Sequence, residues 1–541
     1  MPSAFFIMPV FIAIVTLVAL YFRGEAYLKY FQQEEYDTRR FLTWVRCNAA
    51  IDRVATLIIV ISLLVGLSAE TMGSGQFAVI IALMASIFLS RNAIKQSKKP
   101  LVMTARVKRI FAVYMISSLV IYFVTTLFLH SYHDQMNFNV VILALPALLL
   151  QLSPLILVLS KMLLDPQEKA VQAKFRMEAE QKLKSLKPQI IAITGSFGKT
   201  SCKHILNHIL SATQPTLATP GSVNTIMGIT RVIREQLKPE HKFFIVEMGA
   251  YGPGSISKLC AFTPPELGLI TAVGAAHYER FKSLQTVAEA KFELAEDVFS
   301  RGGQMIVSTD GIDEGLLQDR MNVVSGDYIL VGEGQSMQFS KCVMDKEGLT
   351  LTIDSNGEEA QIMQVPLYGH HQAANILISV AAARALDVPW SVIRAALRTM
   401  PQIKHRVEVS RIRGQITTIN DAYNSNPIGF IAALEVLDSL KNDGGRRILV
   451  TPGMVELGTR HDEDHARVGR KAAHLADIIL AVTPDRMPSF VDAVLHEGKA
   501  QVIEFTTQDQ AETWVKQNVT LLDVVLFENN LPDLYESRVF F

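Results

Sequence analysis

The sequence predicts a helical membrane unit followed by an α/β protein with mostly parallel sheets, and three observations lead to this fold class. The first 160 residues contain five long apolar runs, in a chain whose hydrophobic share is 49% and whose mean hydropathy is +0.24. The later residues alternate short apolar runs of strand length with helical patterns, which is typical of parallel sheets. The charge divides at the same place, because the net charge is +6 over residues 1–160 and −6 over the rest of this 541-residue chain. The resulting zero net charge argues against a general nucleic-acid-binding protein.

The five apolar runs predict a membrane unit over residues 1–162. They lie at about 4–22, 54–69, 75–90, 109–130 and 138–160. Several meet the roughly 20 apolar residues that a helix needs to cross a bilayer, whereas the second and third are shorter and could form a tight helical hairpin or a re-entrant pair. The loops 23–53 and 91–109 carry six and seven basic residues, and the other two connections carry none. By the positive-inside rule, we expect a multi-pass protein of the cytoplasmic (inner) membrane with its N-terminus outside and residue 161 in the cytoplasm. No run has a charged residue well inside it, so anchoring is favoured over transport.

A glycine-containing loop follows the first predicted strand of the α/β part, after a charged helical connector over 163–187. The apolar run 190–193 leads into Thr194-Gly195-Ser196-Phe197-Gly198-Lys199-Thr200-Ser201, and a helical pattern follows over 202–212. Glycines let backbone N–H groups approach a phosphate, and the helix N-terminus adds partial positive charge. In this setting Lys199 is expected to neutralise phosphate oxygens and Thr200 to hold Mg²⁺. The loop has the shorter G-x-x-G-K-T form, so its strand–loop–helix context carries the prediction of a nucleotide site.

Three further side chains are candidates for the same edge of the sheet. Glu247 ends a buried strand-like run, His277 follows another, and Lys291 lies in a helical pattern. An acid at the carboxyl end of a parallel strand can reach the Mg²⁺ of a nucleotide on the neighbouring loop. Taken alone, Glu247 reads equally well as a helix cap or surface pair. A lone histidine is more often structural, but the place of His277 just past a strand end beside the phosphate loop favours a functional role. Without this context, Lys291 reads as an exposed helical lysine. The cysteines are too scattered for a metal site or a disulfide framework, and reduced thiols are expected at Cys47, Cys202, Cys260 and Cys342.

Eight segments in this order resemble the Mur ligase family, the ATP-dependent amide ligases of peptidoglycan precursor synthesis. They are TGSFGKTS at 194–201, GSVNTIMGIT at 221–230, VEMGAYGPGSI at 246–256, GAAHYERFKSLQTVAEAKFE at 274–293, GHHQAANILISVAAA at 369–383, HRVEV at 405–409, INDAYNSNP at 419–427 and PGMVELG at 452–458. Within the family, the branch that adds D-alanyl-D-alanine to a UDP-linked muramoyl tripeptide is the most similar. The resemblance implies a central P-loop ATP-binding domain over 188–402 and a smaller Rossmann-like C-terminal domain over 403–541. Residues 326–365 read as short strands that form an antiparallel insertion in the central domain.

The resemblance also implies roles for single residues of the central domain. Nucleotide contacts are implied for Gly195, Ser196, Gly198, Lys199, Thr200 and Ser201. Glu247 corresponds to the first Mg²⁺ ligand and His277 to the histidine that serves a second Mg²⁺. Lys291 corresponds to a lysine that is carbamylated in several members, which turns a cation into a metal-binding carboxylate. Asn224 lies in the segment that faces the acceptor, and Asn375 resembles the asparagine on the adenine side.

In the C-terminal domain, the resemblance implies residues that close over the nucleotide. Arg406, at the hinge into this domain, resembles the arginine that contacts the ATP phosphates. The residues of the mobile domain that contact the nucleotide are Asp421, Tyr423, Asn424 and Asn426. The implied chemistry is transfer of the ATP γ-phosphoryl group to a substrate carboxylate, followed by attack of an amine on the acyl phosphate. Lys199, His277, Lys291 and Arg406 would then carry the catalysis.

Two departures from the family leave the acceptor open. The predicted membrane unit stands in place of the soluble N-terminal domain that holds the UDP group, and residues 525–533 replace a Lys-Gly-Ser-type element. We therefore expect a small-molecule, lipid-linked or polymeric carboxylate acceptor, an amino acid or dipeptide as the amine, and contact with membrane lipid. The alternatives are a poly-γ-glutamate synthetase-like polymer ligase, and an ATP-driven transporter or membrane regulator that carries a ligase-like module.

Overall fold

The computed structural model divides the chain into two compact units, Met1–Gln172 with Leu531–Phe541, and Ala173–Asn530. We call them the helical unit and the α/β unit and describe each by itself. The structure describes residues 3–48, 50–65, 72–95, 100–130, 135–274, 281, 283–411, 416–422, 425–455 and 457–531.

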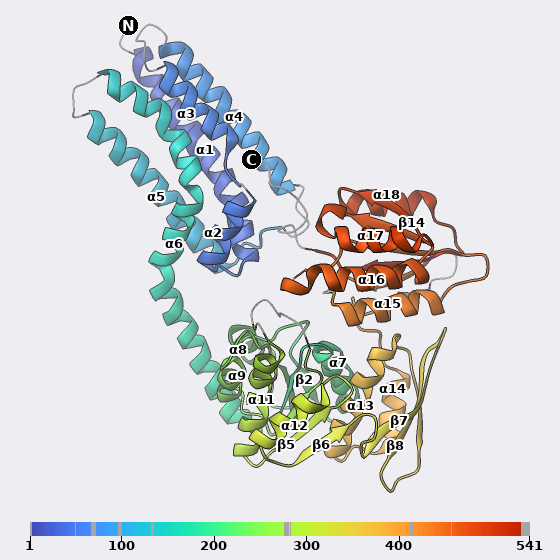
Figure 1. The fold of residues 1–541 in the computed structure, drawn as a ribbon. Coiled ribbons are helices and arrows are strands. Elements are labelled where there is room, and N and C mark those ends of the chain that lie inside the picture. The colour runs from blue at the N-terminus through green and yellow to red at the C-terminus, as the bar shows by residue number, and fades with distance from the viewer. Residues whose placement is uncertain are drawn as a thin grey trace. The chain divides into compact units, whose positions relative to one another are not determined.

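The helical unit forms helices at every predicted apolar run (Figure 1). They are α1 (Ser3–Gln33), α3 (Arg53–Val65), α4 (Met72–Lys95), α5 (Ala105–His130) and α6 (Gln135–Leu186), with a short amphipathic α2 (Thr38–Cys47) in the first basic loop. Three helical segments are long and apolar enough to cross a membrane, namely Val10–Gln33, Ala105–Phe128 and Leu143–Leu186. The apolar part of α4, Gln76–Asn92, is shorter, and α3 has 13 described residues, or about 20 Å of helix. Five crossings and their orientation therefore stay a prediction.

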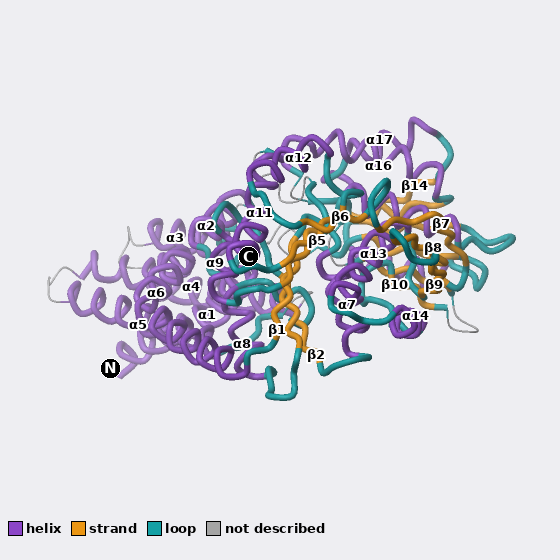
Figure 2. Tube along the Cα trace, turned by 90° about the horizontal axis from the view of Figure 1, so that it is seen from below, coloured by secondary structure: helices purple, strands orange, loops and turns teal. Residues whose placement is uncertain are grey.

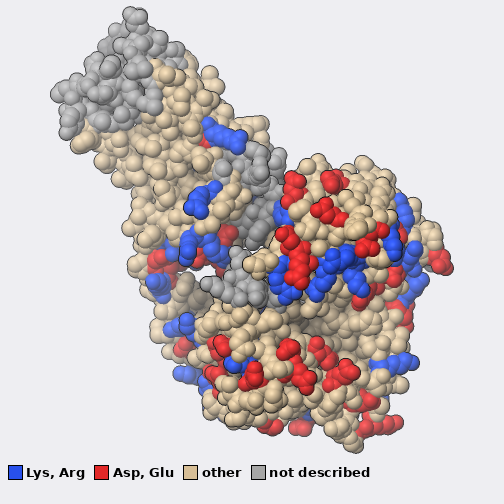
Figure 3. All heavy atoms as spheres, viewed as in Figure 1, with Lys and Arg blue, Asp and Glu red and all other residues tan. Residues whose placement is uncertain are grey.

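The fifth apolar run and the predicted connector form a single helix, because α6 continues without interruption to Leu186. On α5, large apolar side chains such as Ile116, Phe123 and Phe128 are exposed. On the face drawn in Figure 3, a broad stretch of the described surface of this unit carries no charged side chain. Such a surface is unusual for a protein in water and marks a site of contact with lipid or with another protein.

A buried ion pair lies inside the helical unit. Arg23 of α1 and Asp52, which precedes α3, are both fully buried and in contact. Ser86 of α4 accepts a hydrogen bond from Arg23 at 2.9 Å and donates one to Asp52 at 3.1 Å. Asp52 also accepts from the backbone N–H of Ala55 at 2.8 Å, which caps the start of α3. The pair therefore joins three helices.

The α/β unit contains a nine-stranded sheet in the order β2-β3-β1-β4-β5-β6-β7-β8-β9. Its strands are β1 (Gln189–Thr194), β2 (Thr216–Ala218), β3 (Phe243–Glu247), β4 (Leu267–Ile270), β5 (Gln304–Ser308), β6 (Tyr328–Val331), β7 (Met337–Asp345), β8 (Gly348–Ser355) and β9 (Gln361–Val365). The strands β1 to β6 pair in parallel, and β7, β8 and β9 pair antiparallel. The predicted antiparallel insertion at 326–365 thus differs in one strand, since β6 pairs parallel with β5 and continues the central sheet.

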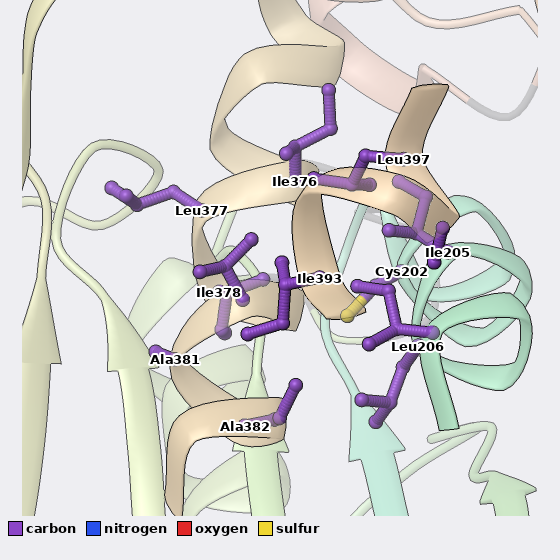
Figure 4. Packing of buried hydrophobic residues seen from close by; sticks show 14 of the residues in the cluster. Cys202, Ile205, Leu206, Ile376, Leu377, Ile378, Ala381, Ala382, Ile393 and Leu397 are labelled. Carbon is purple, nitrogen blue, oxygen red and sulfur yellow. The ribbon is translucent and has the colours of Figure 1, made fainter. Parts of the chain in front are cut away.

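Helices cover both faces of this sheet (Figure 2). One face carries α7 (Lys199–Ser211), α13 (His370–Ala385) and α14 (Trp390–Arg398), and the other carries α8 (Ile226–Glu235), α9 (Ser255–Phe262), α11 (Leu284–Ser300) and α12 (Glu314–Val323). Cys202, Ile205 and Leu206 project from α7 toward Ile376 of α13 and Ile393 of α14 (Figure 4). This packing of apolar side chains at helical spacing fixes the start of α7, which directly follows the predicted phosphate loop.

A second, six-stranded sheet has the order β10-β11-β15-β12-β13-β14. Its strands are β10 (Glu408–Ser410), β11 (Thr417–Asp421), β12 (Arg447–Thr451), β13 (Ile478–Val482), β14 (Gln501–Phe505) and β15 (Val524–Glu528). Its helices are α15 (Pro427–Ser439), α16 (His461–Leu475), α17 (Pro488–Glu497) and α18 (Gln508–Asn518). All pairings are parallel except that of β10 with β11. The predicted α/β class with mostly parallel sheets is confirmed.

Candidate active site

The predicted phosphate loop joins β1 to α7 and depends on two glycines. Gly195 and Gly198 have φ angles of 155° and 80°, in the region that favours glycine. A Cβ atom at Gly195 would collide with the hydroxyl of Thr271, and one at Gly198 with the side-chain oxygen of Asn375. Both positions therefore require glycine on two grounds, the backbone conformation and the lack of space.

The end of β4 holds the loop in place. The Ser196 backbone N–H donates to the carbonyl of Ala272 at 2.8 Å, and the Ser196 hydroxyl accepts from the N–H of Gly274 at 2.9 Å. The hydroxyl of Thr271 donates to the carbonyl of Phe197. Thr271 was missed at the sequence level, because nothing in its own segment indicates that it contacts a loop 74 residues away.

The ammonium of Lys199 is folded over the loop. Its Nζ donates to the carbonyl of Gly195 at 2.6 Å and lies 3.4 Å from the carbonyl of Ser196. Burial lowers the pKa of Lys199, the Glu247 carboxylate opposes this, and the positive charges of Arg406 and Lys203 add to the lowering. An anion placed at the loop would relieve the repulsion between these cations, as a phosphate would.

Thr200 and Glu247, which the sequence analysis assigned to one Mg²⁺ site, are adjacent. The hydroxyl of Thr200 donates to Glu247 Oε2 at 3.1 Å. The same oxygen forms an ion pair with Lys203 at 2.8 Å, and Asn224 Nδ2 donates to Glu247 Oε1 at 3.4 Å. Burial lowers the pKa of Lys203, and its partner carboxylate opposes that shift. Asn224, the predicted acceptor-side residue, therefore belongs to the same cluster, and Lys203 is a member that the sequence analysis did not name.

Lys291 is buried on α11, with 5% of its surface exposed. Among the described residues, its ammonium forms no hydrogen bond or ion pair. Burial lowers the pKa of Lys291 well below its ordinary value, and the charge of Lys199 adds to this lowering. A neutral amine is the form that reacts with carbon dioxide, so this environment suits the predicted carbamate. His277 lies outside the described residues, and its assignment stays a prediction.

The residues that fit Mg²⁺ here are oxygen donors. Thr200 supplies a hydroxyl, Glu247 a carboxylate, and a carbamate on Lys291 would supply further oxygens, which is the ligand chemistry that Mg²⁺ prefers. Among the described residues, no cluster of three His, Cys, Asp or Glu side chains has the geometry of a metal site. The candidate set depends on a hydroxyl and a modified lysine, which such a cluster does not include.

Asn375 and Arg406 lie near the phosphate loop. Asn375 donates through Nδ2 to Gln372 Oε1 at 3.1 Å, while its oxygen faces Gly198. It thus contacts the loop itself, and its predicted contact with the adenine stays a prediction. Arg406 stands between His405 and Val407, whose φ angles of 58° and 51° are unusual for residues with a side chain. Its positive charge contributes to the pKa values of Lys199 and Asp421.

In the second sheet, Asp421 and Glu528 are opposite each other at the ends of β11 and β15. Both are buried, and Glu528 Oε1 accepts from the Ser425 hydroxyl at 2.6 Å. Burial raises the pKa of Asp421 to about 6, and burial together with the Asp421 charge raises the pKa of Glu528 well above its usual value. The side chain of Asn426 caps α15, accepting from the N–H of Gly429 at 2.9 Å. The sequence analysis did not identify Glu528, and its candidates Tyr423 and Asn424 lie outside the described residues.

Two models of known protein domains match the α/β unit of this chain. The Mur ligase middle domain matches residues 193–383, and the Mur ligase glutamate ligase domain matches residues 405–528. A UDP-N-acetylmuramoyl-tripeptide–D-alanyl-D-alanine ligase of Buchnera aphidicola subsp. Acyrthosiphon pisum is 30% identical over 321 residues, covering 58% of this chain and 68% of the relative. The chain therefore belongs to the Mur ligase family, as the sequence motifs predicted.

Other relatives agree with this assignment. The ligase of the same name from Buchnera aphidicola subsp. Baizongia pistaciae is 29% identical over 280 residues, covering 52% of this chain and 60% of the relative. The crystal structure of MurF ligase from Thermotoga maritima in complex with ADP superimposes with a TM-score of 0.58 at 23% identity, covering 68% of this chain and 82% of that one. This last similarity shows the fold. The chain thus spans 60% of the length of the Baizongia pistaciae relative and 68% of that of the Acyrthosiphon pisum relative. The family match begins at residue 193, after the helical unit.

Proposed function

We propose that this chain is a membrane-associated, ATP-dependent amide ligase of the Mur type that acts in cell-envelope precursor synthesis. The observation that carries the proposal is the cluster at the phosphate loop, where Thr200 contacts Glu247 at 3.1 Å and the charge of Lys199 acts on the buried Lys291. A phosphate loop alone would suit many nucleotide-binding proteins. The buried lysine and the acid at the strand end are what the Mur ligase motifs add to it.

Different residues of the site would bind the nucleotide, the metal ion and the substrate carboxylate. The loop N–H groups and Lys199 bind the ATP phosphates, and Arg406 adds a second positive charge. Thr200 and Glu247, with Lys291 as a carbamate and His277, would hold Mg²⁺, which would offset the negative charge of the phosphates. Positioned in this way, a substrate carboxylate accepts the γ-phosphoryl group and releases ADP. An amine then attacks the acyl phosphate, forming the amide and releasing phosphate.

The C-terminal domain completes the site. Asp421 and Asn426, with Tyr423 and Asn424, close toward the nucleotide and exclude water from the acyl phosphate. Asn375 orients the nucleotide from α13. With the predicted domain boundaries, 188–402 and 403–541, Arg406 would lie at the hinge between the two parts.

We propose that the acceptor reaches the enzyme at the membrane. The relatives are named for a UDP-linked muramoyl tripeptide, but the family match begins at residue 193, and the helical unit precedes it. Three helices long and apolar enough to span a membrane, with exposed apolar side chains on α5, support association with lipid. A lipid-linked or polymeric carboxylate fits this arrangement. Ligation of D-alanyl-D-alanine to the soluble UDP-linked tripeptide at the rate of a soluble ligase would contradict this part of the proposal.

The test of the ligase activity uses Lys291→Ala. A ligase should lose nearly all of the ADP formation that depends on an added carboxylate and an added amine, whereas a transporter would retain hydrolysis independent of both. Lys258→Ala, which replaces an exposed lysine of the α/β unit, is the matched control and should behave as the wild type. Equal coupled turnover in wild type and Lys291→Ala would overturn the proposal.

A further inference from the structure

Lys203 is a buried cation to which the proposed chemistry assigns no role. It lies one helical turn after Lys199 on α7, and its side chain is fully buried. Its Nζ contacts Glu247 Oε2 at 2.8 Å and also donates to the carbonyl of Gly221. A buried ammonium needs partners of this kind, and both of them belong to segments at the candidate site.

The carboxylate of Glu247 is held on both of its oxygens. Oε2 accepts from Lys203 and from Thr200, and Oε1 lies 3.4 Å from the amide nitrogen of Asn224. Because Lys203 approaches the same oxygen as Thr200, its position decides how far the carboxylate turns toward the Thr200 hydroxyl. Without the ammonium, the carboxylate would be free to turn toward Asn224.

The second partner of Lys203 lies in the segment between β2 and α8. Gly221 and Asn224 belong to this segment, and the carbonyl of Asn224 accepts from the N–H of Gly249 at 3.1 Å. The phenol of Tyr251 donates to Asn224 Oδ1 at 3.1 Å. One ammonium thus joins α7, the end of β3 and the loop at 221–224.

We infer that Lys203 is a positioning residue that holds Glu247 in its Mg²⁺-binding orientation and fixes the 221–224 loop beside it. The inference rests on the proposed function, in which Glu247 and Thr200 hold the metal of the nucleotide. It assigns to Lys203 no contact with ATP. A purely structural ion pair would instead affect the folding of the domain without affecting Mg²⁺.

The test compares the binding of ADP with and without Mg²⁺ in the full-length protein. Isothermal titration gives the dissociation constant of ADP in EDTA and in excess Mg²⁺. The first divided by the second, which we call the Mg²⁺ ratio, measures the contribution of the metal. Lys203→Met should lower this ratio about 10- to 100-fold, the usual effect of removing a residue that orients a metal ligand. The affinity for ADP in EDTA should change less than twofold. Lys203→Arg keeps the charge but not the shape of the side chain, so its Mg²⁺ ratio should lie between those of the wild type and Lys203→Met.

The matched control breaks an ion pair far from the loop. In Arg446→Met the buried carboxylate of Asp523 loses its partner, which lies at 2.7 Å, and the Mg²⁺ ratio should equal that of the wild type. Hydrogen exchange supplies a second readout, since the Gly249 N–H should exchange faster in Lys203→Met and at the wild-type rate in Arg446→Met. A wild-type Mg²⁺ ratio in Lys203→Met would overturn the inference.

If Lys203→Met does not fold, Lys203→Arg is the deciding variant. A threefold or larger loss of its Mg²⁺ ratio supports the inference, and an unchanged ratio overturns it.

Two results for the wild type separate this inference from the proposed function. If the wild type binds ADP with a clear Mg²⁺ dependence but forms no amide, the proposed function fails while Lys203 can still be tested. If the wild type shows no Mg²⁺ dependence, the inference fails even where ligation is observed.

Discussion

The two units of this protein each contain a fully buried ion pair, and the two pairs differ in what surrounds them. Arg23 and Asp52 in the helical unit have 0% exposed side chains, and Lys203 and Glu247 in the α/β unit have 0% and 2%. Burying a charged pair gives little net stability on average, although breaking such a pair is costly. Burial alone therefore does not distinguish a structural pair from one that serves a reaction.

The neighbours of each pair make the distinction. Around Arg23 and Asp52 lie the Ser86 hydroxyl and the start of α3, all of which are parts of the helical unit itself. Around Lys203 and Glu247 lie the phosphate loop, the Thr200 hydroxyl and the 221–224 loop. We therefore expect loss of the first pair to affect folding and loss of the second to affect metal-dependent binding.

The largest expected effect is that of Lys199→Ala, which should remove most of the turnover while the protein remains folded. Removal of the ammonium that Gly195 holds at 2.6 Å should lower ATP-dependent turnover about 10³-fold, as for other donors aimed at developing charge. ADP formation in the presence of carboxylate and amine measures it, with Lys258→Ala as control. A loss below tenfold would mean that the loop does not bind the transferred phosphoryl group.

Asp52→Asn tests the structural side of the comparison. It keeps the cap of α3 but removes the carboxylate charge that contacts the buried Arg23, which should destabilise the helical unit by about 3–5 kcal/mol. Thermal unfolding in detergent measures the loss, followed by the fluorescence of the buried Trp44 in a protein whose other two tryptophans are replaced (Trp390→Phe/Trp514→Phe). The double variant Arg23→Met/Asp52→Leu should recover most of it. Unchanged stability of Asp52→Asn would show that the pair contributes nothing to the bundle.

The carbamate on Lys291 predicts an effect of dissolved carbon dioxide. The lowered pKa of Lys291 increases the share of the neutral amine, which is the form that reacts with carbon dioxide. Turnover of enzyme dialysed in carbon dioxide-free buffer should fall about tenfold and should recover on addition of bicarbonate, since an oriented metal ligand is lost and regained. Turnover of Lys291→Ala should not respond to bicarbonate. Equal wild-type turnover with and without bicarbonate would contradict a carbamate on Lys291.

The smallest effect concerns Asp421 and Glu528, a pair of like charge. Their pKa values are raised in the folded protein, so the folded state favours the protonated forms and loses stability as pH rises from about 4 through about 6 and above. Glu528→Gln removes this penalty and should raise stability by about 1–3 kcal/mol at pH 8, but by little at pH 4.5. Thermal unfolding at both pH values measures the difference. A gain of equal size at both would contradict the raised pKa values.

The sequence predicted those parts of the site that depend on local pattern. A short apolar strand, a glycine loop and an apolar helical face are encoded within residues 190–212, and an acid at the end of β3 is apparent from the run before it. The α/β class follows from the same alternation of elements.

Contacts between distant residues could not be predicted in this way. Lys203 meets Glu247 44 residues along the chain, and Ser425 meets Glu528 103 residues along. The one local signal for Lys203 is its place in the apolar stripe of α7, next to Cys202 and Leu206, where a charged residue requires a buried partner. The short helix α2 was missed because its amphipathic pattern lies within the basic loop 23–53, which was used only to predict the membrane orientation.

The most direct test of the central claim is mass spectrometry of the products formed by full-length protein in membranes. The membranes are incubated with ATP, candidate carboxylate acceptors and candidate amino acids or dipeptides, with Lys199→Ala membranes as control. If the protein is a ligase, we expect a new amide in an amount equal to the ADP and to the phosphate released. This amide should be absent from the Lys199→Ala sample. Release of ADP and phosphate at the same rate with neither carboxylate nor amine present, and with no new amide, would contradict it.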